Sequence, residues 1–344
     1  MIRIQNIYHM LAYAFQVLQE QGYKDVAVEE FENTAELLSA ILCKGVSVQI
    51  KRGLGRQYIA KEEPLSTPRG KIEVSESIKT QVIRKKQLVC TYDEFSVDAY
   101  MNRIIKTTML VLLKANISKI RKKEIRKLLI FFDEVTTLDK NSINWHIQYD
   151  RNNQTYRMLM AICQLILEGL LQTQSDGKMH IMEFIDEQRM CRLYEKFILE
   201  YYKKHYPQIT ARAEQIPWQL DDGYGDMLPI MQTDIMLRKG DTVLIIDAKY
   251  YSHTTQVQYD VHTLHSNNLY QVFTYVKNKE NELKNKPHQV SGMLLYARTD
   301  EDIYPNHTYQ MSGNRIDVKT LNLDGEFALI KKQLDCIIQE FFEI

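Results

Sequence analysis

Two aspartates and a lysine in neighbouring apolar segments have the types and spacing needed for metal-dependent chemistry. Asp234 begins the first segment, Asp247 and Lys249 end the second, and Gly240-Asp241 joins them. Gly followed by Asp is typical of a two-residue hairpin turn, because both residues tolerate positive φ. Residues equally distant from such a turn face each other, which predicts that Asp234 lies opposite Asp247. Side chains alternate along a strand, so Lys249 is expected on the same face as Asp247.

This arrangement has a cost that a bound cation would remove. Like charges directly opposite each other destabilise a pair of strands. The rest of the hairpin is apolar on both faces, which indicates a strand covered on both sides. A hard divalent cation can be bound by as few as one or two protein carboxylates. The lysine could activate a water molecule or stabilise a pentavalent phosphate. The pattern therefore predicts metal-assisted phosphodiester hydrolysis. The alternative is a strand end at which both acids simply reach solvent.

The sequence Asp247-Ala248-Lys249, preceded by Asp234, resembles the pattern of the PD-(D/E)xK nuclease superfamily. Thr233 stands where that pattern often has proline. The resemblance implies that Asp234, Asp247 and the backbone carbonyl of Ala248 bind Mg²⁺. It also implies that Lys249 orients or activates the attacking water and offsets the charge that develops during the reaction.

Two residues on expected helices add to this resemblance. Glu195 stands where the superfamily often places an acid upstream of the core strands. Gln271 stands where many members carry a helical glutamine after those strands. Both are predicted to be supporting catalytic residues. For Glu195 the alternative is an ordinary helix acid that faces solvent.

The spacing of apolar residues predicts an α+β N-terminal module of helices and strands, followed by an α/β domain. A polar stretch at 173–177 interrupts the periodicity and sets the boundary. Residues 1–175 are predicted to form the module and residues 176–344 the domain. The order of helix, strand hairpin, strand, helix and strand in the second part suits a central mixed sheet, as in restriction-endonuclease-like PD-(D/E)xK proteins. Helices are expected over 7–18, 36–50, 99–115, 156–171, 189–206, 269–282 and 325–342.

Charge is unevenly distributed although the formal net charge is zero. Residues 1–150 carry five more basic than acidic residues, and the remainder carries five fewer. Phosphate binding needs cations, so affinity for DNA is expected to come from outside the acidic part. The best candidate surface is the basic run 119–127, together with Arg84-Lys85-Lys86. A solvated charged face is the alternative.

Other features of the sequence exclude several classes of protein. The five cysteines are scattered and lack C-x-x-C spacing, which indicates reduced thiols in a cytoplasmic protein rather than disulfides or a zinc site. The N-terminus lacks the apolar region of a signal peptide. No apolar run reaches about 18 residues, so no membrane association is expected. No G-x-x-x-x-G-K-[ST] sequence occurs, so the chain is not expected to bind a nucleotide in a Walker-type site.

The N-terminal half narrows the resemblance to the McrC family. The opening QNIYHMLAYAF at 5–15 is similar to the start of short McrC proteins. Four further similar stretches follow in the expected order, at 53–58, 69–72, 92–95 and 102–106. Together with the nuclease pattern they cover nearly the whole chain.

McrC is the nuclease subunit of the McrBC modification-dependent, type IV restriction system. The resemblance implies docking on a ring of the GTP-hydrolysing AAA+ protein McrB and stimulation of its GTPase. It also implies Mg²⁺-dependent cleavage of double-stranded DNA that contains modified cytosine. The partner would bind the GTP and recognise the modified base. Arg56 or Arg69, in the first module, is hypothesised to contact the ring and promote hydrolysis in trans.

Two other functions fit the same residues. A stand-alone nuclease for DNA repair or junction processing would cut DNA with Mg²⁺ alone. A non-catalytic DNA-binding activator of an AAA+ partner would keep the fold without cutting. The intact set of Asp234, Asp247 and Lys249 argues against this second alternative.

Overall fold

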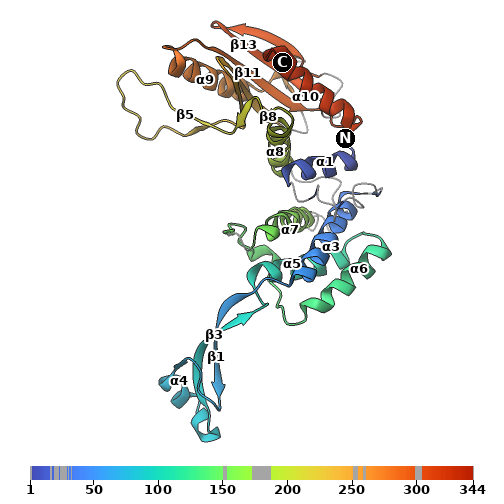
Figure 1. Ribbon diagram of the computed structural model, residues 1–344, viewed down its shortest axis with the longest axis vertical. Helices are drawn as coiled ribbons and strands as arrows, with labels where there is room; N and C mark the ends of the chain where they lie inside the picture. The colour runs from blue at the N-terminus through green and yellow to red at the C-terminus, as the bar shows by residue number, and fades with distance from the viewer. Residues whose placement is uncertain are drawn as a thin grey trace. The chain divides into compact units, whose positions relative to one another are not determined.

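The computed structural model divides into two compact units (Figure 1). One unit contains Met1–Phe31 and Phe184–Ile344, and the other contains Glu32–Glu183. Among the residues it describes, no helix combines the length and apolar character needed to cross a membrane. The described residues are 2–15, 18, 23, 29, 31, 33–149, 153–172, 187–250, 255–258, 261–298 and 304–343.

The division differs from the predicted one at the N-terminus, since the first 31 residues belong with the C-terminal unit. Helix α1 (Ile4–Ala14) packs on helix α8 (Glu187–His205). The Tyr13 ring lies 5.5 Å from the Phe197 ring, and Asn6 Nδ2 donates to the Leu323 carbonyl at 2.7 Å. Apolar periodicity shows that a helix has a buried face, but not which distant segment covers it. The predicted boundary stretch at 173–177 lies outside the described residues.

The unit that contains the C-terminus is built on a six-stranded sheet of strand order β12-β13-β11-β8-β7-β4. Strand β11 pairs in parallel with β8 on one side and with β13 on the other. The remaining pairs of the sheet are antiparallel. The predicted central mixed sheet is therefore confirmed. The strands are β4 (Thr210–Arg212), β7 (Ile235–Lys239), β8 (Thr242–Lys249), β11 (Gln289–Ala297), β12 (His307–Met311) and β13 (Asn314–Leu321).

Helices cover both faces of this sheet, which explains why its central strands are almost wholly apolar. Helix α9 (Ser266–Leu283) packs Val272 and Val276 against Val243 and Ile245 on one face. Helix α10 (Phe327–Phe341) covers the other face, where Arg315 stacks on an aromatic ring of α10 (Figure 1). Short strand pairs complete the unit: β5 (Gln215–Ile216) with β6 (Met231–Gln232), and β9 (Thr255–Gln258) with β10 (Val261–Leu264).

The other unit combines a helical group with a small three-stranded sheet. Its helices are α3 (Thr34–Arg52), α4 (Val74–Lys79), α5 (Tyr100–Lys114), α6 (Lys119–Leu129) and α7 (Gln154–Gln172), with short 3₁₀ turns η3 (Val82–Lys85), η4 (Ile130–Phe132) and η5 (Lys140–Ser142). Asn33 caps α3 by accepting the Glu36 N–H at 2.8 Å. The helix ends at Gly53, whose φ of 93° suits glycine, as the sequence predicts.

The strands of this unit form a small antiparallel sheet of order β1-β3-β2. The long partners β1 (Gln57–Leu65) and β3 (Leu88–Ser96) pair along their whole length, and β2 (Lys71–Ile72) adds to β3. Gly55 fixes the base of this pair: its N–H donates to the Tyr156 hydroxyl at 2.7 Å, and its carbonyl accepts from Asn102 at 2.8 Å. A Cβ at Gly55 would lie 3.0 Å from that hydroxyl, so the close approach favours glycine.

Candidate active site

The predicted hairpin is present, with the predicted register. Ile235 pairs with Ile246 and Lys239 with Thr242, and Gly240 adopts a φ of 58° in the turn between them. Asp234 immediately precedes β7 and continues this register opposite Asp247.

Asp234 is held in place by the backbone around it. Its Oδ2 accepts the Ala248 N–H at 3.0 Å. Thr233, where the nuclease pattern that this chain resembles often has proline, donates its own N–H to the Glu214 carbonyl at 3.0 Å. Proline has no N–H and could not make that bond. A residue other than proline at this position therefore has a local structural reason.

Asp247 and Lys249 form a close pair on the face of β8 that is covered by α9. Lys249 Nζ donates to Asp247 Oδ1 at 3.0 Å and lies 3.0 Å from Oδ2 as well. The Asp247 side chain is 1% exposed, so its charge is removed from water. Such a carboxylate is costly unless a cation or several donors compensate it. The lysine supplies part of that compensation.

Helix α9 brings Gln271 to this pair, together with a tyrosine that the sequence analysis did not identify. Lys249 Nζ donates to Gln271 Oε1 at 3.4 Å. Gln271 Nε2 donates to the Tyr275 hydroxyl at 2.9 Å, and that hydroxyl donates to the Gln232 carbonyl at 3.1 Å. The four-residue spacing of Gln271 and Tyr275 on one helix face is the signal that could have revealed Tyr275.

Helix α8 brings Glu195 to the other side of Ala248, again with an unpredicted neighbour. Cys191 Sγ donates to Glu195 Oε1 at 3.1 Å and lies 3.7 Å from the Ala248 carbonyl oxygen. Burial raises the pKa of Glu195, and the negative charge of Asp234 raises it further. Glu195 is therefore close enough to share the electrostatic environment of the site, rather than facing solvent. Cys191 precedes Glu195 by four residues on α8, the same spacing that separates Gln271 from Tyr275 on α9.

The two aspartates disfavour simultaneous ionisation. Burial raises the pKa of Asp247 to about 7; Lys249 opposes this rise and Asp234 adds to it. Burial also raises the pKa of Asp234, against the opposing effects of Lys249 and the Ala248 N–H. Desolvation and like charge both favour the protonated form of a carboxyl group. A further cation between them would favour the doubly ionised pair.

The donor atoms present fit a hard cation such as Mg²⁺. Asp247 Oδ2 is buried and accepts no hydrogen bond, although Lys249 Nζ lies nearby. Mg²⁺ is commonly held by one or two carboxylates, with water and phosphate oxygens completing its shell. Within the described ranges, no three His, Cys, Asp or Glu side chains are grouped closely enough to hold a metal by themselves. A metal here would therefore depend on the two aspartates, the Ala248 carbonyl, water and substrate.

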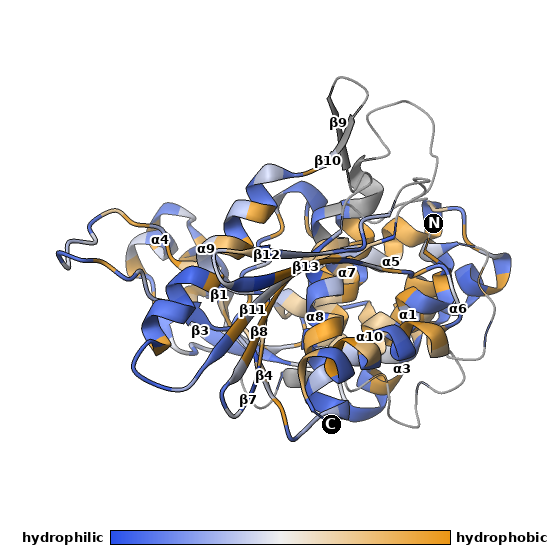
Figure 2. Ribbon diagram, turned by 90° about the horizontal axis from the view of Figure 1, so that it is seen from above, coloured by the Kyte–Doolittle hydropathy of each residue, from blue (hydrophilic) through white to orange (hydrophobic). Residues whose placement is uncertain are grey.

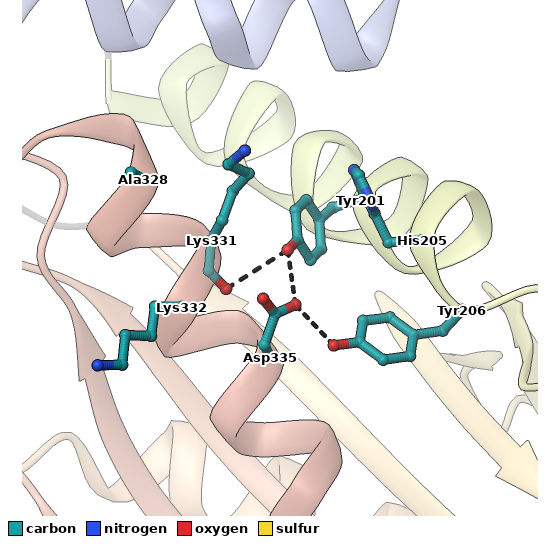
Figure 3. Close-up of a pocket in the computed structure, with 7 residues that line it drawn as sticks. All are labelled: Tyr201, His205, Tyr206, Ala328, Lys331, Lys332 and Asp335. Atoms are coloured by element: carbon teal, nitrogen blue, oxygen red, sulfur yellow. Dashed lines mark hydrogen bonds between the residues drawn. The ribbon is translucent and has the colours of Figure 1, made fainter. Parts of the chain in front are cut away.

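A separate hollow of about 450 Å³ lies between α8 and α10 in the same unit (Figure 3). Tyr201 and Tyr206 both point into it and donate to Asp335 Oδ1, at 2.7 and 2.6 Å. Its other lining residues are His205, Ala328, Lys331 and Lys332. None of the predicted catalytic residues lines it. The hydroxyl groups are engaged with Asp335, so the carboxylate pair on the hairpin is the better candidate for chemistry.

Comparison with known proteins identifies the family. The family model described as "McrBC 5-methylcytosine restriction system component" matches residues 4–297, which include every candidate catalytic residue. The chain belongs to this family. The resemblance to the McrC family that the sequence indicated is thereby confirmed.

Similar proteins cover almost the whole chain. The Type IV methyl-directed restriction enzyme EcoKMcrBC of Escherichia coli (strain K12) is 28% identical over 348 residues, which span 99% of each chain. A refined half-complex from the tetradecameric assembly of Thermococcus gammatolerans McrB AAA+ hexamers with bound McrC contains a chain with a TM-score of 0.50 and 16% identity. That match covers 96% of this chain and 76% of the other, and it supports the fold alone.

Proposed function

We propose that the chain is a Mg²⁺-dependent endonuclease that cuts double-stranded DNA within a modified-cytosine-directed, type IV restriction complex. The observation that supports this most directly is the pair formed by half-buried Asp234 and buried Asp247, with Lys249 in contact with both Asp247 and Gln271. Family membership supplies the restriction system. The mixed sheet that carries this hairpin supports assignment to the PD-(D/E)xK superfamily.

In this proposal Asp234, Asp247 and the Ala248 carbonyl hold Mg²⁺. The ion, when bound, supplies Lewis acidity and lowers the pKa of a coordinated water molecule. The protein's part is to keep both carboxylates aligned and ionised. The Ala248 N–H aligns Asp234, and the lysine ammonium favours the ionised form of Asp247. Glu195 contributes a third acid at the edge of the site, oriented by Cys191.

Lys249 acts on the reacting phosphate in this mechanism. Its ammonium lies beside Asp247 and offsets the negative charge that grows as a phosphodiester is attacked. It also orients the attacking water. Gln271 helps to hold the ammonium in place, because its amide oxygen accepts from Nζ at 3.4 Å. Preorganised charge of this kind stabilises a transition state without reorganisation during the reaction.

The partner in this proposal is a GTP-hydrolysing AAA+ ring like McrB. The structurally similar McrC chain from Thermococcus gammatolerans is described as bound to McrB AAA+ hexamers. This chain has no Walker-type sequence of its own, so the partner would bind GTP and recognise the modified base. All five cysteines are free thiols, as suits a reaction in the cytoplasm.

We place the contact with the ring on the unit Glu32–Glu183, and on its strand pair in particular. Arg69 stacks on the Tyr92 ring at 4.4 Å, next to Gly70, where a Cβ would lie 2.4 Å from the Thr91 carbonyl oxygen. Arg56 is exposed at the base of the pair, near the Phe95 ring. Either guanidinium could stabilise charge on a partner's GTP in trans. Arg56→Ala and Arg69→Ala should lower stimulated GTPase rates, and unchanged rates for both would remove this role.

Cleavage assays with purified components test the main proposal. The wild-type chain is expected to cut methylated duplex DNA only with Mg²⁺, GTP and the partner ring. The Asp247→Asn variant should abolish cutting while GTPase stimulation persists. Cutting with Mg²⁺ alone would instead indicate a stand-alone nuclease. Undiminished cutting by Asp247→Asn would show that this hairpin is not the active site.

A further inference from the structure

Helix α6 carries a cationic surface that the proposed chemistry does not use. Its buried side, formed by Arg121, Ile125 and Leu128, packs into the unit Glu32–Glu183. The opposite side presents exposed cations at three- and four-residue spacing, which places them on one helix face. These are Lys119, Lys123, Arg126 and Lys127, with the half-buried Lys122 at the margin. Figure 2 shows the helix as mostly hydrophilic.

Acids in the described part of the chain do not neutralise these cations. The only acid in the helix, Glu124, accepts from Arg121 at 2.6 Å. Arg121 also pairs with Glu36 at 3.4 Å. Among the residues that the structure describes, none of the five cations on the outer face has an ion-pair partner. The outer face therefore has an uncompensated positive charge.

The arrangement also opposes the stability of the helix. Cations in the first turn are unfavourable because the N-terminus already carries positive partial charge. No acid lies in that turn, and Lys119 and Lys122 do. Three like-charged pairs at four-residue spacing, such as Lys119 with Lys123, add repulsion along the helix face. A run that breaks two local rules, without a compensating contact to any residue that the structure describes, is expected to have a function.

We propose that this face of α6 binds the phosphate backbone of duplex DNA, independently of base sequence. This inference builds on the proposed function, in which such DNA is the substrate. From Lys119 to Lys127 the helix spans about 12 Å, which matches several successive phosphates of one strand. The Asp234–Asp247 hairpin lies in the other unit and repels phosphate when no metal is bound, so a separate cationic contact would retain the DNA.

A protein partner is the competing occupant of this face. Ile120 is 82% exposed beside the lysines, and Ile130 and Phe131 are exposed just beyond the end of the helix. Apolar side chains of this kind fit a protein interface better than a phosphate backbone. The cations outnumber them, however, and charge complementarity favours a polyanion. The test must separate the two occupants.

The test is a salt titration of DNA binding by the full chain. The variant Lys119→Gln, Lys123→Gln, Lys127→Gln is compared with a control that removes equal charge elsewhere, Lys284→Gln, Lys286→Gln, Lys332→Gln. All three control lysines are exposed in the other unit. Both sets are made on the Asp247→Asn background, so that the labelled duplex stays intact. Binding is measured by fluorescence anisotropy across a KCl series.

The α6 variant should bind DNA roughly 10-fold more weakly at low salt. The slope of log affinity against log salt should be smaller in magnitude by about 3, because each lost phosphate contact reduces that slope by roughly 0.9. The control should match the parent. An unchanged slope, or an equal loss in the control, overturns the inference. Normal DNA binding with reduced GTPase stimulation assigns the face to the protein partner and also overturns it. These outcomes do not depend on cleavage, so a wild-type chain that never cuts would refute the proposed function separately.

Discussion

The β7–β8 hairpin and helix α6 both bring like charges together, but they do so in different surroundings. Asp247 is buried and the half-buried Asp234 faces it, whereas Lys119, Lys123 and Lys127 lie on an exposed helix face. Water and salt screen the exposed lysines, so each repulsion costs only tenths of a kcal/mol. The buried carboxylates lack that screening, and burial is the largest cause of the raised pKa of Asp247.

The difference indicates what each region needs from a ligand. A buried acid pair is relieved by one cation of suitable size at one position. An exposed cationic face is relieved by any extended polyanion, with an affinity that depends on salt. The first arrangement suits chemistry at a defined atom, and the second suits binding without sequence preference.

The largest effect is expected for Asp247→Asn. Cleavage should fall by about 10³-fold or more, because a metal ligand and the partner of Lys249 are lost together. The metal-free variant should nevertheless be more stable than the wild type at pH 8, by about 2 kcal/mol, since an ionised buried carboxylate is removed. Chemical denaturation at fixed pH measures the stability difference. A clear loss of stability at pH 8 would contradict the assigned cost of burial.

The same residue gives a pH dependence with a defined sign. Burial raises the pKa of Asp247 from 3.8 to about 7, so the folded state retains a proton that the unfolded state has released. The stabilisation from the protonated form is therefore present below about pH 4 and is lost as the pH rises to about 7. The stability advantage of Asp247→Asn should grow across this window and then level off. A difference independent of pH would contradict the prediction.

Added Mg²⁺ should restore the stability that the wild-type protein loses as the pH rises. A ligand that binds only the folded protein raises its apparent stability, and carboxylate ligands must be deprotonated to bind it. The rise in Tm on adding Mg²⁺ should therefore be larger at pH 8 than at pH 6, and absent in Asp247→Asn. Differential scanning fluorimetry measures both. KCl at matched ionic strength serves as a control for a purely ionic-strength effect, which would act equally on the variant.

A smaller effect is expected for Tyr275→Phe. The hydroxyl accepts from Gln271 Nε2 and donates to the Gln232 carbonyl, so it turns the amide oxygen of Gln271 toward Lys249. Losing it should lower kcat by about 10-fold with little change in KM. Gln271→Ala should cost a similar amount, and the double variant no more than either alone. Additive losses would show that Tyr275 acts in another way.

The smallest effect is expected for a single substitution on the exposed face of α6. Lys119→Glu places an acid in the first turn of α6 and opposite Lys123 on the same face. The free energy of unfolding should rise by about 0.5 to 1 kcal/mol. DNA binding should weaken at the same time. A loss of stability would mean that Lys119 has a structural partner and would weaken the contrast with the hairpin.

Residues close together in the sequence allowed the centre of the site to be predicted. The turn at Gly240-Asp241 sets the register of the hairpin, and register sets which side chains face each other. The positions of Asp234, Asp247 and Lys249 follow from this local rule. Their catalytic roles stay predictions until cleavage is measured.

The neighbours of these residues could not be predicted in the same way. Tyr275 and Cys191 are ordinary helix residues until α9 and α8 pack on the sheet and bring them to Gln271 and Glu195. Periodicity shows that each helix has an apolar face, but it does not give the rotation and position of that face against a particular strand. Those depend on the packing of many side chains at once.

Spacing along the chain was enough to predict the hairpin, the alternation that places Lys249 beside Asp247, and the cationic run of α6, because each is a property of neighbouring residues. The folded chain was needed to show that α1 belongs to the unit of the mixed sheet, and that helices α8 and α9 bring Glu195 and Gln271 to the hairpin. Contacts between distant segments are fixed by the shared burial of apolar surface. No local pattern records which surfaces meet.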